Sequence, residues 1–209
     1  MRNYWVLMVM NAFLSFGVFS QGTKMTTSEV NAFKQKIEKE TQSLKSIQTD
    51  FIQEKHLTFL SNNIESKGKM YLLADGTLKW AYSSPNQYSI IFKGNKIFIN
   101  DNGKKSNVDG GNEVFGKISQ LISGSVSGKL FNDAEFDLVC YKEGNEIVAH
   151  LTPNNNMLKK YIKKVYLYFP ENESTVSKVR LIEPTEDYTL ITFINKKLNA
   201  NIDSSIFNH

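Results

Sequence analysis

Hydrophobic side chains recur every three or four positions over about residues 28–45, which is the spacing of one face of a helix. The stripe consists of Val30, Phe33, Ile37 and Leu44. Thr26 and Glu29 precede it at the spacing of a capping box, in which each side chain accepts a hydrogen bond from the backbone N–H of the other. The pattern therefore predicts an amphipathic helix whose apolar side covers a sheet.

After residue 46 the hydrophobic positions alternate with polar ones, as in strands that bury one face of a sheet. Turn residues such as Asp75-Gly76 and Asn102-Gly103 separate the runs at intervals of about 8–12 positions. The runs cover residues 47–52, 70–72, 78–82, 88–92, 97–99, 136–141, 147–152, 162–168, 176–182 and 188–193, and the apolar segment 202–207 closes the chain. Because such direct turns leave no room for helical crossovers, the sequence predicts an antiparallel meander of about 11 strands, a mainly β fold with some helix.

A second helical stripe interrupts the strands near the middle of the chain. Its members are Val114, Phe115, Ile118, Leu121 and Ile122, and Gly124 and Gly128 follow them. A flexible connection after an apolar helix is typical of a cover that can move. An ordinary packed helix in a crossing loop explains the same pattern equally well.

The chain is rich in aromatic side chains, with 14 Phe, 9 Tyr and 2 Trp. By parity, one face of the first meander carries Phe51, Met70, Leu72, Leu78, Trp80, Tyr82, Ile90 and Phe92. If such a sheet curls without closing, this face becomes an apolar trough that suits acyl chains and needs a cover. The alternative is that these side chains pack as ordinary core beneath the helices.

The first twenty residues have the pattern of a cleavable secretory signal. Arg2 supplies the positive start, the run from Tyr4 to Phe19 is almost wholly apolar, and cleavage is expected before Gln21. A membrane anchor is less favoured, because the run is shorter than the roughly 20 residues of a spanning helix. No cysteine stands at the cleavage point, so we expect an exported single domain of residues 21–209 without a lipid anchor.

Charge and cysteine content restrict the partners and the source of stability. The net charge of +4 is mild and the lysines are scattered, which indicates a solvated face, with weak attraction to anionic membranes as the alternative. Nucleic acid is not an expected partner of an exported protein with this balance. Cys140 is the only cysteine, so an internal disulfide is impossible, and its apolar neighbours indicate a small buried hydrophobe.

Residue patterns that carry chemistry are sparse. His56, His150 and His209 lie in different contexts, and none has a second histidine at the spacing of a local metal site. The chain has neither a Gly-x-Ser-x-Gly elbow nor a glycine-rich phosphate loop. The three carboxylates of residues 183–187 indicate a solvated turn rather than an acid–base pair. The sequence therefore predicts no enzyme, no metal and no cofactor.

Several short motifs follow one another in a fixed order. They are residues 44–53, which contain Phe51 and Gln53, then residues 68–72, residues 78–80 with Pro85 after them, residues 89–96, and residues 151–153. In order and spacing they resemble the LolA family of periplasmic lipoprotein carriers over nearly all of residues 21–209. At the hairpin position where the best-known members have an arginine that latches a lid, this chain has Ala74, and its C-terminal tail is nearly absent.

The resemblance implies an unclosed half-barrel whose helices cover a hydrophobic cavity. The eight side chains on the face described above would line the cavity, and Phe115, Ile118, Leu121 and Ile122 would form the lid. It also implies a monomeric periplasmic carrier that accepts acylated lipoproteins from an inner-membrane ABC exporter and delivers them to an outer-membrane acceptor. Absence of a lipid-anchoring cysteine favours a free shuttle over the anchored receptor of the same fold.

Two other interpretations of the sequence stay open. One is a half-barrel of the same kind that carries or senses another lipid or glycolipid, or that regulates envelope stress. The other is an envelope hydrolase, for which the sequence offers no favoured catalytic residue.

Overall fold

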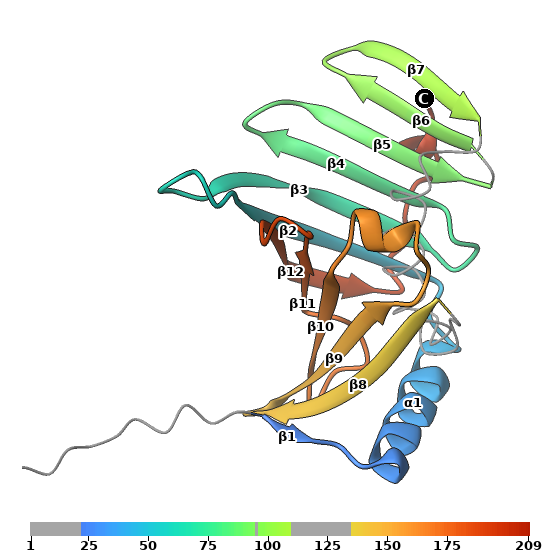
Figure 1. Cartoon of the computed structure of the whole chain (residues 1–209). Coiled ribbons are helices and arrows are strands. Elements are labelled where there is room, and N and C mark those ends of the chain that lie inside the picture. The colour runs from blue at the N-terminus through green and yellow to red at the C-terminus, as the bar shows by residue number, and fades with distance from the viewer. Residues whose placement is uncertain (1–21, 95, 110–134) are drawn as a thin grey trace, which may run out of the picture.

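The computed structural model of the chain describes residues 22–94, 96–109 and 135–209. The predicted signal segment 1–20 and the predicted second helix around residues 114–122 lie outside these ranges. Within them the chain forms one α-helix, two short 3-10 helices and twelve strands. All twelve strands belong to a single sheet, which Figure 1 shows as a strongly twisted and curved surface.

The strands follow one another as two meanders. In chain order they are β1 (Thr23–Lys24), β2 (Ser46–His56), β3 (Ile64–Leu73), β4 (Leu78–Ser84), β5 (Tyr88–Lys93), β6 (Lys96–Asp101), β7 (Lys104–Asp109), β8 (Phe136–Glu143), β9 (Glu146–Pro153), β10 (Lys164–Pro170), β11 (Lys178–Ile182) and β12 (Tyr188–Leu198). In space the order is β1-β8-β9-β10-β11-β12-β2-β3-β4-β5-β6-β7, and every neighbouring pair is antiparallel.

Strands β1 and β7 are the two edges of the sheet, so the sheet does not close on itself. The predicted unclosed antiparallel half-barrel is therefore confirmed. Each of the ten predicted internal runs coincides with a strand, although β10 and β11 begin two residues later than predicted, at Lys164 and Lys178; β1 and β7 were not predicted from the sequence. The first meander consists of β2 to β7 and the second of β8 to β12. They meet where β12 pairs with β2, a contact between segments more than a hundred residues apart.

The helix α1 (Thr27–Thr41) begins with the predicted capping box. The backbone N–H of Glu29 donates to Thr26 Oγ1 over 3.3 Å, and the backbone N–H of Thr26 donates to Glu29 Oε2 over 2.8 Å. The helix ends at Thr41, about four residues before the predicted end, so Leu44 does not belong to it. There the Thr41 hydroxyl donates back to the carbonyl of Ile37 over 2.7 Å, and the chain turns towards β2.

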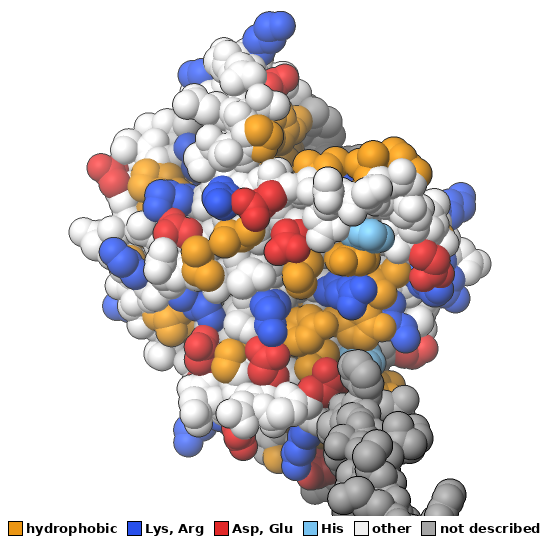
Figure 2. Space-filling model, turned by 90° about the vertical axis from the view of Figure 1, so that its left-hand side faces the viewer, with side chains coloured by type: hydrophobic (Ala, Val, Ile, Leu, Met, Phe, Trp, Pro, Cys, Tyr) orange, Lys and Arg blue, Asp and Glu red, His pale blue; other side chains and the backbone are white. Residues whose placement is uncertain are grey.

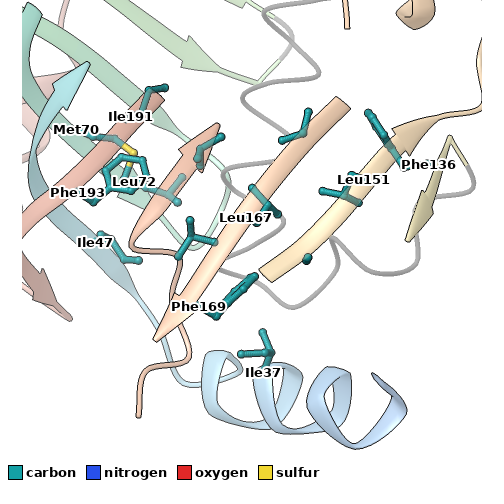
Figure 3. Packing of buried hydrophobic residues seen from close by; sticks show 14 of the residues in the cluster. Ile37, Ile47, Met70, Leu72, Phe136, Leu151, Leu167, Phe169, Ile191 and Phe193 are labelled. Atoms are coloured by element: carbon teal, nitrogen blue, oxygen red, sulfur yellow. The ribbon is translucent and has the colours of Figure 1, made fainter. Parts of the chain in front are cut away.

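The apolar side of α1 covers one half of the inner face of the sheet. Figure 3 shows Ile37 pointing from the helix towards Phe169 and Leu167 on β10. The Phe33 ring meets Phe169 edge-on, with 5.2 Å between ring centroids. Burying each such side chain contributes about 1.5–3 kcal/mol. Within the described part of the chain, α1 leaves the half formed by β2 to β5 without a helical cover (Figure 1).

The end of the chain packs on the outer face of the sheet. The apolar segment 202–207 contains the 3-10 helix η3 (Ser204–Phe207), whose Phe207 is buried. The Lys79 ammonium of β4 donates to the carbonyl of Ile206 over 2.8 Å. This contact fixes the last residues against β4 and adjacent strands, on the side opposite to the inner face.

His150 lies on the outer face of β9 between two tyrosine rings. Its ring centroid is 4.4 Å from that of Tyr141 and 4.5 Å from that of Tyr166. Burial is the main reason that the pKa of His150 is lowered from 6.5 to about 4, and the nearby positive charge of Lys164 adds to it. Glu143 is 3.9 Å from the ring nitrogen, beyond hydrogen-bond distance, and does not reverse this.

The depressed pKa of His150 predicts a loss of stability in mild acid. Since the unfolded chain binds this proton more readily, the contribution is complete above about pH 6.5 and is lost as the pH falls towards 4. The ring is partly exposed and screened by solvent, so we expect a loss of about 1–2 kcal/mol. Urea unfolding at neutral and acidic pH should show that His150→Phe removes this part of the pH dependence. Equal pH dependence in both proteins would contradict the assignment.

Candidate functional site

A cavity of about 500 Å³ lies on the inner face of the sheet. Its walls come from β4 and β5 on one side, from β11 and β12 on the other, and from the β9–β10 connection. The lining residues are Gln53, Lys55, Leu78, Trp80, Tyr82, Ile90, Phe92, Lys160, Tyr161, Ile162, Val179, Leu181, Glu183, Pro184, Thr185, Thr189 and Ile191. Most of these side chains are apolar. The charged ones are Lys55 and Glu183, near the ends of β2 and β11, and Lys160 in the β9–β10 connection.

An aromatic cluster forms the floor of the cavity. Trp80 lies on Phe51 with 4.3 Å between ring centroids, and Tyr82 meets Phe51 edge-on at 5.3 Å. The local reason is the register of β2, β3 and β4, in which Gly68 is paired with both Phe51 and Tyr82. Because Gly68 has no side chain, the Phe51 ring can occupy the space above it.

One uncharged polar contact is built into this apolar wall. The Tyr82 hydroxyl donates to Gln53 Oε1 over 2.9 Å. Burial raises the pKa of Tyr82, and the Trp80 and Gln53 side chains only partly oppose it. The hydroxyl therefore stays neutral, and the described side chains of this aromatic wall present no charge to a ligand.

The charged side chains among the described lining residues stand at the outer margin of the cavity. Lys55 Nζ lies 3.5 Å from Glu183 Oε1, and both side chains are partly exposed. Glu186, in the same β11–β12 turn as Glu183, forms an ion pair with Lys163 of the β9–β10 connection. Such exposed pairs contribute little to stability. The turn of residues 183–187, predicted to be solvated, forms part of the cavity wall through Glu183, Pro184 and Thr185.

The predicted cavity residues fall into two layers. Five of them, Leu78, Trp80, Tyr82, Ile90 and Phe92, line the cavity. The other three, Phe51, Met70 and Leu72, belong to the buried core beneath it, and Leu78, which is 1% exposed, is as buried as they are. The predicted lid residues Phe115, Ile118, Leu121 and Ile122 lie outside the described residues. Ala74 is exposed in the β3–β4 turn, where its backbone N–H donates to the carbonyl of Lys45 over 3.0 Å.

The opposite wall was not predicted from the sequence. It consists of Val179, Leu181, Thr189 and Ile191 from β11 and β12, with Tyr161 and Ile162 from the β9–β10 connection. Parity within β11 and β12 could have placed the four strand residues on one face. This wall lies next to the first meander because Ile191 pairs with Gln53. No local pattern in the sequence predicts that pairing.

The described residues that line the cavity include no His, Cys, Asp or Ser side chain. Cys140 is fully buried, and burial raises its pKa to about 11, so the thiol stays protonated and is a poor nucleophile. Over residues 22–94, 96–109 and 135–209, His, Cys, Asp and Glu form no group of three or more that could hold a metal ion. The helices of the same ranges include none that is long and apolar enough to cross a membrane.

Comparison with known proteins gives matches of sequence and of fold. The family model "Outer membrane lipoprotein carrier protein LolA" matches residues 42–209. An outer-membrane lipoprotein carrier protein from Francisella philomiragia is 26% identical over 163 residues, which cover 70% of this chain and 68% of that protein. An uncharacterized conserved protein from Thermus thermophilus has a similar structure, with a TM-score of 0.51, 8% identity and coverage of 86% of this chain and 92% of the other. A LolA superfamily protein from Nitrosomonas europaea has a TM-score of 0.48, 11% identity and coverage of 84% and 97%.

Proposed function

Because the chain belongs to the LolA family of outer membrane lipoprotein carrier proteins, we propose that it carries acylated lipoproteins from the inner to the outer membrane. In this proposal it works in the periplasm, accepts its cargo from an inner-membrane ABC exporter and passes it to an acceptor at the outer membrane. Cargo is held by its acyl chains and not altered chemically. The observation that carries the proposal is the apolar cavity of about 500 Å³ on the inner face of an open sheet.

The physical need for such a carrier follows from the acyl chains. Each CH₂ group moved from a bilayer into water costs about 0.8 kcal/mol, so a fully exposed lipid anchor costs on the order of tens of kcal/mol. The cavity has the size typical of ligand sites, and its interior side chains are apolar or neutral. Acyl chains placed against Trp80, Ile90, Phe92 and Leu181 would be removed from water without leaving a buried charge unpaired.

We assign different roles to the two layers of residues. Trp80, Tyr82, Ile90 and Phe92 would contact the acyl chains directly. Phe51, Met70, Leu72 and Leu78 would support these side chains from below, since they are nearly inaccessible to a ligand. Closure by Phe115, Ile118, Leu121 and Ile122 stays a prediction of the sequence.

Mass spectrometry of the protein purified from cell envelopes tests the function. We expect co-purified proteins that carry acyl chains, and depletion of the chain should leave lipoproteins in the inner membrane. If lipoproteins reach the outer membrane normally after depletion, the proposal is wrong. Co-purified lipid or glycolipid without any acylated protein would favour a carrier or sensor of another lipid instead.

A further inference from the structure

Exposed hydrophobic side chains gather in connections at one end of the central strands. Among the described residues, the clearly exposed large hydrophobic side chains are Phe59, Leu60, Ile64, Met157, Tyr161, Ile194 and Leu198. The first three belong to the β2–β3 hairpin and the next two to the β9–β10 connection. Only Ile194 and Leu198 lie elsewhere, in the second half of β12.

Strand pairing shows that these two connections lie at the same end of the strands. His56 at the end of β2 pairs with Tyr188 at the start of β12, and Tyr188 pairs with Ile182 at the end of β11. Ile182 in turn pairs with Lys164 at the start of β10. The β2–β3, β11–β12 and β9–β10 connections therefore lie next to one another at the same end of the strands, as antiparallel pairing requires.

The cavity reaches this end of the strands. Its lining includes Lys160 and Tyr161 from the β9–β10 connection, Lys55 near the end of β2, and residues 183–185 of the β11–β12 turn. Figure 2 views the molecule from the side on which the β2–β3 hairpin lies in Figure 1, and shows separate patches of hydrophobic side chains between charged ones. We call the exposed residues Phe59, Leu60, Ile64, Met157 and Tyr161 the rim residues.

The tip of the β2–β3 hairpin is a fixed structure that presents Phe59 to solvent. The backbone N–H of Leu60 donates to the carbonyl of Leu57 over 2.9 Å, which closes a turn. The backbone N–H of Thr58 donates to Asp187 Oδ1 over 2.7 Å, and this bond is the main reason that the pKa of Asp187 lies below its usual value. Phe59 is nevertheless 77% exposed. Its exposure is thus a property of the folded hairpin, and the tip is tied to the turn that lines the cavity.

From these observations we propose that the rim residues bind directly to the surface of a lipid bilayer and place the cavity mouth against it. Residues 57–64 contain no charged side chain of their own. Because the carboxylates of Asp187 and Glu54 bind Thr58 and Asn63, it is the Phe59 and Leu60 side chains that enter the layer of lipid head groups, while the base of the tip stays outside it. Lys159 and Lys160 lie at the same end of the strands and can stay among the lipid phosphates while their stems contact apolar groups. This proposal rests on the proposed function, because it gives acyl chains a path into the cavity that avoids water.

A bilayer fits the rim residues better than a protein partner does. The rim residues stand on two separate connections, whereas a protein interface usually needs a contiguous patch with a packed centre. Projecting single aromatic and aliphatic side chains, with short polar ones between them, are typical of segments that lie in a membrane interface.

Co-sedimentation with vesicles of phosphatidylethanolamine and phosphatidylglycerol tests the proposal. We expect the protein to bind these vesicles, and the double change Phe59→Ser and Leu60→Ser to weaken binding roughly a hundredfold, as expected when two such side chains no longer leave water. Because the tip is uncharged, wild-type binding should persist in high salt. The control is Ile194→Ser with Leu198→Ser, two exposed hydrophobic residues at the other end of β12, and this variant should bind vesicles like the wild type.

A second measurement separates this proposal from the proposed function. Displacement of the neutral fluorescent probe N-phenyl-1-naphthylamine by a triacylated lipopeptide reports the cavity alone, and the rim variant should behave there like the wild type. If the wild type binds lipopeptide but no vesicles, the membrane-docking proposal is wrong and the carrier function stands. If both variants lose vesicle binding equally, the rim has no special role and the proposal is also wrong. Absence of lipopeptide binding by the wild type would overturn the carrier function itself.

Discussion

Gly68→Ala is expected to lower the free energy of unfolding by about 3 kcal/mol or more, because the new methyl group has no room. A Cβ atom at this position would lie 2.5 Å from Cζ of Phe51 and closer still to the carbonyl oxygen of Ala81. Phe51 is 1% exposed and stacked between Trp80 and the strand, so neither contact is relieved by moving a flexible side chain into solvent. Chemical unfolding followed by the fluorescence of Trp80 measures the loss.

Gly144→Ala provides the matched control for this change. Gly144 has a φ of +59°, but a Cβ atom there meets nothing within 4 Å. Its replacement should cost only the roughly 1 kcal/mol of a left-handed backbone with a side chain. Equal losses at Gly68 and Gly144 would mean that the close packing of Phe51 on Gly68 is not what requires glycine at position 68.

Local spacing is enough to predict the elements that carry the site. Alternation in β4 and β5 puts Trp80, Ile90 and Phe92 on one face whatever the partner strand is, because successive side chains of a strand point to opposite sides. The capping box at Thr26 likewise needs only four consecutive residues. The end of α1 depends instead on how the chain enters β2, and this explains the error of about four residues there.

Local spacing does not predict how deeply a side chain is buried or which distant strands pair. Parity puts Phe51 and Trp80 on one face, but cannot say that Phe51 lies beneath Trp80 and outside the cavity. The wall of β11 and β12 faces the first meander only because β12 pairs with β2. The short edge strand β1 is held by only two residue pairs with β8, and two residues carry no periodic pattern.

The unpredicted wall of the cavity therefore gives the sharper test of function. Leu181→Asp is expected to weaken binding of a triacylated lipopeptide about a hundredfold, which corresponds to about 2.7 kcal/mol. Leu181 lies on the cavity wall and packs against the core cluster. Acyl chains that enter the cavity would strip water from the new carboxylate, and among the described lining residues the only cations are Lys55, which already lies 3.5 Å from Glu183, and Lys160 in the β9–β10 connection. Displacement of N-phenyl-1-naphthylamine measures the affinity.

Leu190→Asp controls for the effect of a new charge on the sheet. Leu190 is half-buried like Leu181 and lies on the neighbouring strand, but it pairs with Arg180 and shares the outer face with that residue. A carboxylate there stands on the outer face between its two cross-strand partners, Arg180 and Glu54, and is open to solvent, so lipopeptide binding should stay within about twofold of the wild type. Thr189→Asp adds a second variant of the cavity wall that replaces a polar side chain and puts the fold at less risk. If both wall variants bind lipopeptide as tightly as Leu190→Asp, the acyl chains do not enter between β5 and β11, and another surface must hold them.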